Sequence, residues 1–238
     1  MKAIFVAGTD TGVGKTIVTG LLARHLLTKG YRVVTQKWVE TGSLRSSRDI
    51  GVHLKLMGKR RADYVRHLSA MMPYIFKFAS SPHLAARLEN RHIRKERIKR
   101  SLKELAKHFD IVIIEGCGGL LVSLDKKTLM IDIVKELRLP VLLVAANRLG
   151  AINSTLLSLE ALRSRKIKIT GVIFNNVSKD ENKRILKDNP RIVKALSGVS
   201  VLGTLPYTKD KDFSALNFTG PVAPSPFSLK GCVPYSCT

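Results

Sequence analysis

A glycine-rich loop that directly follows an apolar segment constrains this chain more than any other feature. Residues 8–16 read Gly-Thr-Asp-Thr-Gly-Val-Gly-Lys-Thr and come after the apolar run 3–7. Glycines allow a tight turn in which backbone N–H groups point at an anion, and the N-terminus of a following helix favours negative charge. Five residues separate Gly8 from Gly14, one more than in the standard pattern of this loop. We therefore predict a variant phosphate-binding loop, or P-loop, between a buried strand and a helix.

Such a loop holds a nucleoside triphosphate. Its lysine, here Lys15, reaches the β- and γ-phosphates, and the hydroxyl of Thr16 ligates Mg²⁺. The alternative is a structural turn, because a short Gly-Lys-Thr sequence also occurs by chance. The apolar strand before the loop and the helical pattern after it favour binding of ATP with Mg²⁺. The residues predicted to contact phosphate are Gly8, Thr9, Asp10, Gly12, Val13, Gly14, Lys15 and Thr16.

Length and cysteine usage limit the class of protein. The chain has 238 residues, of which 45% are hydrophobic, and this suits one α/β domain with a sizeable core. No apolar run reaches the roughly 18 residues that a membrane span needs. The P-loop strand stands where a cleaved signal would be, and the three cysteines (Cys117, Cys232 and Cys237) do not suggest a disulfide scaffold. We expect a cytoplasmic protein with no membrane partner.

The net charge of +23 would attract polyanions at low salt. Much of it lies in residues 87–107, where Ile98, Leu102 and Leu105 recur at helical spacing. One interpretation is a helix that binds nucleic acid; the other is a solvated basic face opposite a core stripe. No aromatic residues interleave with the basic ones as a base-stacking surface requires. We favour the solvated face and expect no specific binding of nucleic acid.

Short apolar segments alternate with helical patterns along the chain. Nearly continuous, β-branched apolar runs are typical of parallel strands covered on both faces, and the alternation favours a doubly wound sheet. We predict a mostly parallel, P-loop NTPase-like α/β domain over residues 1–207 and an irregular, proline-rich tail over 208–238. The predicted strands are 3–7, 32–36, 111–115, 141–146, 170–174 and 201–204, and the predicted helices are 15–29, 82–90, 93–108, 130–137 and 153–165.

A polar or glycine-rich loop directly follows each of five predicted strands. Ligands of such sheets bind at the carboxyl ends of the strands. We therefore expect these loops to line one rim. The loops are 8–16, 37–43, 115–119, 147–153 and 175–176.

Two acidic residues are candidates for a metal site on this rim. Glu115 ends a predicted strand, where a second contact to Mg²⁺ would come from. Asp49 would complete the set with Thr16, although an acid at the N-terminus of a helix fits its position nearly as well. Both acids thus accompany the P-loop threonine in the predicted metal site.

Other residues on the rim have a functional and a structural interpretation. Lys37, at a strand end, would stabilise charge on a transferring phosphoryl group, unless it is a surface lysine. Cys117 has no base near it in sequence, which favours a small buried residue over a nucleophile. Residues 80–83 read as a helix cap and start whose N–H groups suit an anion. Asn175 and Asn176 offer amides suited to the edge of a purine, or form a plain turn.

The ordered set of these motifs resembles dethiobiotin synthetase over residues 1–207. Its most specific element is the loop opening Gly-Thr-Asp-Thr with the longer spacer. The family often has proline where this chain has Trp38, and serine where it has Thr41. The other matching motifs are Lys37 with Thr41-Gly42, Ser81-Pro82-His83, Glu115-Gly-Cys-Gly-Gly119, Leu149-Gly-Ala-Ile-Asn153, Asn175-Asn176 and Leu202-Gly-Thr-Leu-Pro206.

The resemblance implies an ATP- and Mg²⁺-dependent ligase of biotin synthesis. Such enzymes join CO₂ to 7,8-diaminononanoate and close a cyclic urea. They are homodimers in which the loop matching 150–153 meets the substrate carboxylate of the partner subunit. The resemblance implies catalytic roles for Lys15, Lys37 and Thr11, metal contacts from Thr16, Asp49 and Glu115, nucleotide contacts from Asn175 and Pro206, and substrate contacts from Thr41, Ser81, Gly118, Gly150 and Asn153.

Two other P-loop classes remain as alternatives. Amidoligases that act on cobyrinate carry a second domain with a catalytic cysteine and histidine, and this chain ends near the first domain. Partitioning or positioning ATPases are nucleotide-switched modules that bind DNA or protein. They usually have an additional lysine near the start of the loop, where this chain has Gly-Thr-Asp-Thr at 8–11. The loop sequence therefore favours the ligase.

Overall fold

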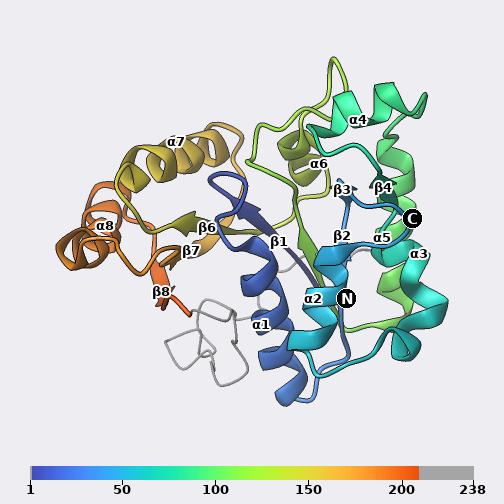
Figure 1. Cartoon of the computed structure of the whole chain (residues 1–238), viewed down its shortest axis with the longest axis horizontal. Coiled ribbons are helices and arrows are strands. Elements are labelled where there is room, and N and C mark those ends of the chain that lie inside the picture. The colour runs from blue at the N-terminus through green and yellow to red at the C-terminus, as the bar shows by residue number, and fades with distance from the viewer. Residues whose placement is uncertain (1, 209–238) are drawn as a thin grey trace.

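The computed structural model describes residues 2–208. Within them the apolar runs form a six-stranded parallel sheet in the order β2-β5-β1-β6-β7-β8 (Figure 1). Helices flank this sheet, so β5 and β6 are buried at every residue and β1 at every residue except Lys2. The strands are β1 (Lys2–Gly8), β2 (Val33–Lys37), β5 (Ile111–Glu115), β6 (Val141–Ala146), β7 (Ile169–Asn175) and β8 (Val201–Leu205). The predicted fold class is confirmed, whereas the predicted tail lies outside the described residues except for Thr208.

The register of the central strands gathers their functional ends. Lys37 of β2 and Val6 of β1 both pair with Glu115 of β5. Gly8, the last residue of β1, pairs with Val144 of β6. All of these strands run parallel, so the lysine, the carboxylate and the start of the P-loop lie at one edge of the sheet.

The helices largely follow the predicted ranges, and Figure 1 shows α1 beside α2 and α7 beside α8. Helix α7 begins two residues before the predicted start, because Gly150 (φ 84°) forms its N-cap. On α5 the predicted stripe of Ile98, Leu102 and Leu105 is buried. The helices are α1 (Lys15–Thr28), α2 (Arg48–Leu56), α3 (Leu68–Met71), α4 (Pro82–Leu88), α5 (Lys95–His108), α6 (Met130–Glu136), α7 (Ala151–Ser164) and α8 (Lys183–Ser197), with a 3₁₀ helix at Arg61–His67. None of the helices within residues 2–208 is long and apolar enough to cross a membrane.

Several elements were not predicted from the sequence. They are α2, α3, the 3₁₀ helix, α8 and a small parallel sheet of β3 (Val39–Thr41) and β4 (Tyr74–Phe76). Helix α8 contains Pro190, which has no N–H to give to the carbonyl of Leu186. The amide Nδ2 of Asn147, at the end of β6, donates to that carbonyl at 2.9 Å instead. A side chain far away in the sequence thus satisfies the carbonyl that the proline leaves without its helical hydrogen bond.

Helices α1 and α2 approach each other closely at Gly20. A Cβ atom at this position would lie 2.9 Å from Cβ of Leu56 and 3.3 Å from Cα of His53. Glycine inside a helix is unfavourable by itself. Here it allows α2 to lie against α1, which brings the N-terminal turn of α2 to the P-loop.

Candidate active site

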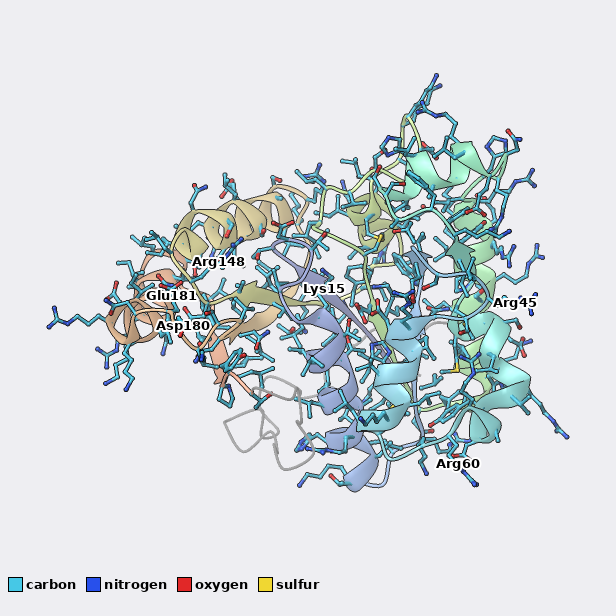
Figure 2. The ribbon with its side chains drawn as sticks, viewed as in Figure 1. Lys15, Arg45, Arg60, Arg148, Asp180 and Glu181 are labelled. Atoms are coloured by element: carbon cyan, nitrogen blue, oxygen red, sulfur yellow. The ribbon has the colours of Figure 1, made fainter. Side chains whose placement is uncertain are left out.

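The P-loop of the structure joins β1 to α1 as the sequence predicts. Gly12 and Gly14 have φ of 74° and 99°, a conformation that favours glycine. The ammonium of Lys15 is buried and donates to the carbonyl of Asp10 at 2.7 Å. Burial, together with the charge of Lys37, lowers the pKa of Lys15 to about 8. Figure 2 places Lys15 in the middle of the molecule, at the start of α1.

Four further side chains meet at the end of this loop. Oγ1 of Thr16 lies 3.0 Å from Oε1 of Glu115 and 3.1 Å from Oδ1 of Asp49. Nζ of Lys37 lies 2.8 Å from Oε1 of Glu115 and 2.6 Å from Oδ2 of Asp49. Lys37 is only 4% exposed, so the alternative of a surface lysine is wrong. The structure brings all four predicted residues into one cluster.

Mutual attraction sets the charges of this cluster. Burial alone would lower the pKa of Lys37, but Glu115 and Asp49 outweigh it and raise that pKa above its ordinary value. Burial alone would raise the pKa of Glu115, but Lys37 and a hydrogen bond from His53 hold it well below its ordinary value. The lysine is therefore charged and the carboxylate ionised at neutral pH.

The oxygen atoms of this cluster fit a magnesium ion. Mg²⁺ prefers oxygen ligands and is commonly bound by one or two carboxylates together with substrate phosphates and water. The hydroxyl of Thr16 lies within hydrogen-bond distance of the carboxylates of both Asp49 and Glu115. They adjoin the loop whose N–H groups suit phosphate. The chemistry of the donors therefore matches the predicted metal.

Two residues that organise the cluster were missed from the sequence. His53 is fully buried on α2, one helical turn after Asp49, and its Nε2 lies 2.7 Å from Oε2 of Glu115. Glu40 is buried on β3 and accepts hydrogen bonds from the hydroxyls of Ser43 and Ser47 and from the N–H of Arg48. The four-residue spacing of Asp49 and His53 was a usable signal, since it places both on one helix face.

A cleft of about 930 Å³ extends from the P-loop over the ends of the strands. Its far side includes Thr41, whose hydroxyl donates to the carbonyl of Ser80 at 2.8 Å, and Ser81, the N-cap of α4. Of the predicted site residues, the cleft is lined by Thr11, Gly12, Gly14, Lys15, Thr16, Lys37, Thr41, Asp49, Ser81, Glu115, Gly118, Asn175 and Pro206.

One of the five predicted rim loops does not line the cleft. Gly150 and Asn153, in the loop before α7 and its first turn, are absent from the lining residues. Their strand, β6, lies between β1 and β7, but the chain leaves it toward α7. All five loops therefore follow the carboxyl ends of parallel strands at one edge of the sheet, as expected, and four of them line the cleft.

The wall of the cleft at β7 is attached to the P-loop. Nδ2 of Asn175 donates to the carbonyl of Val13 at 3.0 Å. A Cβ atom on Gly14 would lie 2.3 Å from that nitrogen, so only glycine fits here. Asn175 is thus held directly beside the phosphate loop.

Cys117 also lines the cleft and is partly buried, rather than buried as expected. Burial raises the pKa of its thiol to about 11. A thiol that is protonated at neutral pH is a poor nucleophile. The structure therefore gives no support to covalent catalysis by this residue.

A parallel sheet with a glycine-rich loop between β1 and α1, and with carboxylates beside the loop threonine, defines a P-loop nucleotide-binding protein. A family model described as an AAA domain matches residues 2–214. Curated relatives are more specific, and through them the chain belongs to the dethiobiotin synthetase family.

Two of these relatives cover most of both chains. The "ATP-dependent dethiobiotin synthetase BioD" of Chlorobaculum tepidum is 42% identical over 196 residues, which are 82% of this chain and 80% of the relative. The protein of the same name from Thermodesulfovibrio yellowstonii is 39% identical over 223 residues, 89% of this chain and 93% of the relative. The predicted family is therefore confirmed.

Solved structures support the fold alone. A ParA family ATPase from Chlorobium tepidum superimposes with a TM-score of 0.54 at 16% identity, covering 88% of this chain and 85% of that one. Identity this low carries no conclusion about activity. The likeness confirms the P-loop NTPase-like architecture.

Proposed function

We propose that this chain catalyses the ATP-dependent formation of dethiobiotin from CO₂ and 7,8-diaminononanoate. Membership of the dethiobiotin synthetase family supports the reaction. The observation that carries it is one continuous cleft, in which the P-loop and the cluster of Lys37 and Glu115 are joined to Thr41 and Ser81. Such a cleft can hold a phosphate donor and a small acceptor side by side.

The formation of dethiobiotin proceeds in three steps, and atoms and charge balance in each of them. One amine of the substrate adds to CO₂ and loses a proton, which gives a carbamate. A carbamate oxygen attacks the γ-phosphorus of ATP and ADP leaves, so a carbamic–phosphoric anhydride forms. The second amine attacks the anhydride carbonyl, phosphate leaves, and the amine loses a proton as the cyclic urea closes.

The residues divide this work between charge and position. Lys15 and Lys37 would oppose the negative charge that grows on the phosphoryl oxygens and on the attacking carbamate. Thr11 lines the cleft beside them and would contact the reacting groups. Thr41, Ser81 and Gly118 would position the diamine, because holding both reactants together removes much of the entropic barrier.

Thr16, Asp49 and Glu115 would hold Mg²⁺. When bound, this ion would neutralise charge on the phosphate oxygens of the nucleotide. The three side chains keep their oxygen atoms together at the start of α1, at distances of 3.0 and 3.1 Å from Oγ1 of Thr16.

Asn175 and Pro206 would contact the base of the nucleotide. Both line the cleft near the P-loop. A side-chain amide has two N–H donors and one carbonyl acceptor, so the bond from Asn175 to Val13 leaves capacity for the edge of adenine.

The proposal includes a cytoplasmic homodimer built from one domain over residues 1–207. Gly150 and Asn153 would meet the substrate carboxylate in the cleft of the partner subunit. Two large apolar side chains on the same segment support an interface there, since Leu149 is 78% and Leu157 is 62% exposed. Contiguous exposed apolar surface, rather than a single exposed side chain, marks sites where proteins associate.

The test is formation of the cyclic urea from ¹³C-bicarbonate, ATP, Mg²⁺ and the diamine. We expect a product with one ¹³C atom and phosphate release that requires the diamine. A folded Lys15→Ala variant should lose about 10²-fold or more of the turnover, whereas Lys55→Ala, at an exposed position on α2, is the control. ATP hydrolysis that is equally fast without diamine and is stimulated by DNA would refute the ligase assignment.

A further inference from the structure

His53 contacts the carboxylate of Glu115 on the side away from the P-loop threonine. Its Nε2 lies 2.7 Å from Oε2, while Thr16 and Lys37 lie 3.0 and 2.8 Å from Oε1. The two oxygen atoms of one carboxylate therefore have different partners. A carboxylate oxygen only accepts hydrogen bonds, so Nε2 of His53 carries the proton between them.

The packing of α2 fixes the histidine ring in this place. His53 is 0% exposed, and its backbone lies against Gly20 of α1. Its Nδ1 atom has no hydrogen-bond partner among residues 2–208. The hydrogen bond to Glu115 is thus the polar contact that the structure records for this ring.

We infer that His53 is a positioning residue that restricts Glu115 to a single-oxygen contact with the metal and so favours Mg²⁺ over Ca²⁺. The inference rests on the proposed function, in which Glu115 and Thr16 hold the metal. Oε1 lies beside Thr16, whereas Oε2 is occupied by the Nε2–H group of His53. Both oxygen atoms of the carboxylate cannot then turn to one ion.

The two ions differ in their need for that second oxygen. Mg²⁺ is small and requires an octahedral arrangement of six ligands, to which a carboxylate contributes one oxygen. Ca²⁺ is larger, takes six to eight ligands and readily binds both oxygen atoms of one carboxylate. Partners of metal ligands typically change metal affinity by about 10- to 100-fold when they are removed.

Variants at position 53 separate the hydrogen bond from the space that the ring fills. In His53→Gln the side-chain Nε2 has a reach similar to that of the imidazole Nε2, so it keeps a donor for Glu115. The amide of His53→Asn corresponds to Nδ1 and falls short, and His53→Leu fills the space without a donor. His92→Leu, which removes an exposed histidine, is the control.

The experiment measures metal binding without turnover. Mn²⁺ is bound to the chain with a hydrolysis-resistant ATP analogue, and its release is followed by electron paramagnetic resonance as Mg²⁺ or Ca²⁺ is added. The wild type and His92→Leu should release Mn²⁺ at much lower Mg²⁺ than Ca²⁺ concentrations. In His53→Leu and His53→Asn the ratio of these concentrations should shrink about tenfold, and His53→Gln should restore most of it.

A purely structural role for His53 would lower thermal stability and leave the ratio unchanged. An unchanged ratio in folded His53→Asn would therefore overturn the inference, as would a ratio in His53→Gln equal to that in His53→Leu. If the wild type discriminates between the ions as expected but forms no cyclic urea, the proposed function fails alone. Product formation by a wild type whose selectivity does not depend on His53 refutes the inference alone.

Discussion

The ammonium nitrogen of Lys37 lies 2.8 Å from Oε1 of Glu115, and the two side chains are only 5% and 1% exposed. Their strands are neighbours, and the two residues pair across β2 and β5. Asp49 joins them from α2 at 2.6 Å from the same nitrogen. One buried cation is therefore shared by two carboxylates, so each of the three affects both stability and chemistry.

Lys37→Gln should lower kcat by about 10²-fold and change the KM for the diamine much less. The charge that Lys37 opposes grows as the carbamate attacks phosphorus, and an interaction made in the transition state is expressed in kcat. Lys37→Arg should not restore full activity, because a planar guanidinium cannot replace a compact ammonium in this buried space. Steady-state kinetics on both variants give the two constants.

Lys37→Gln also tests how much the buried ion pair of Lys37 and Glu115 contributes to stability. Removing one partner of a buried ion pair typically costs about 3–5 kcal/mol of stability, so the free energy of unfolding must be measured beside the kinetics. Lys55→Gln, at an exposed position on α2, is the matched control. If Lys37→Gln alters only KM in a folded protein, the lysine binds substrate and has no transition-state role.

Glu115→Gln should raise the Mg²⁺ concentration needed for half-maximal activity by about tenfold or more and leave diamine binding little changed. The amide keeps the shape of the side chain but loses the charge that a hard dication prefers. Titration of activity against Mg²⁺ at saturating ATP measures the effect. Glu136→Gln, which removes a surface carboxylate paired with Lys99, is the control. An unmoved Mg²⁺ curve would exclude Glu115 as a metal ligand.

Gly20→Ala should destabilise the protein by about 1–2 kcal/mol although alanine favours helices. The added Cβ atom would lie 2.6 Å from Cδ1 and 2.9 Å from Cβ of Leu56, so α2 must shift, and overpacking of this kind typically costs about 1–3 kcal/mol. Gly51→Ala on α2 has open space around it and should stabilise by up to about 1 kcal/mol. Urea unfolding of both variants gives the comparison; stabilisation by Gly20→Ala would show that the helices are not in tight contact.

Asp110→Asn should remove a stabilisation that depends on pH. Hydrogen bonds from Arg32 lower the pKa of Asp110 from 3.8 to about 2. A carboxyl group whose pKa is lower in the folded than in the unfolded state stabilises the fold at pH values above its unfolded pKa. This stabilisation is lost as the pH falls through the folded pKa. The advantage of the wild type in urea unfolding should be constant above about pH 5 and shrink from about pH 4 toward pH 2. A difference that does not vary with pH, or one matched by Asp180→Asn, would exclude the ion pair as its source.

The strands of the main sheet, the P-loop and five of the helices were accessible from the sequence because their signals are local. An apolar run, a glycine-rich loop and a stripe at helical spacing each lie within a few neighbouring residues. Helix α8 was missed because Pro190 indicates a break, and the compensating amide of Asn147 lies 39 residues before the carbonyl that it satisfies.

The candidate site was likewise predicted only where its residues belong to local sequence patterns. Lys15, Thr16, Lys37 and Glu115 follow strands or loops in recognisable patterns, and the structure brings them together. His53 acts through a contact with a residue 62 positions away. Its four-residue spacing from Asp49 is a signal only when α2 is predicted, and that helix was missed. The loop before α7 follows the carboxyl end of β6 as expected, but no pattern in the sequence indicates that it does not line the cleft.

Glu40 has a consequence for how chains of this family can vary. Its carboxylate accepts from Ser43, Ser47 and the backbone of Arg48, and therefore ties the end of β3 to the start of α2. The residues between these two ties include Leu44, which is 76% exposed. Insertions or deletions near Leu44 should leave Asp49 in place, because the hydrogen bonds of Glu40 hold the residues on both sides of them. The number of residues between the P-loop and the acid that matches Asp49 should therefore vary among distant relatives. An acid at the position of Glu40 on β3 should be the better guide to that residue.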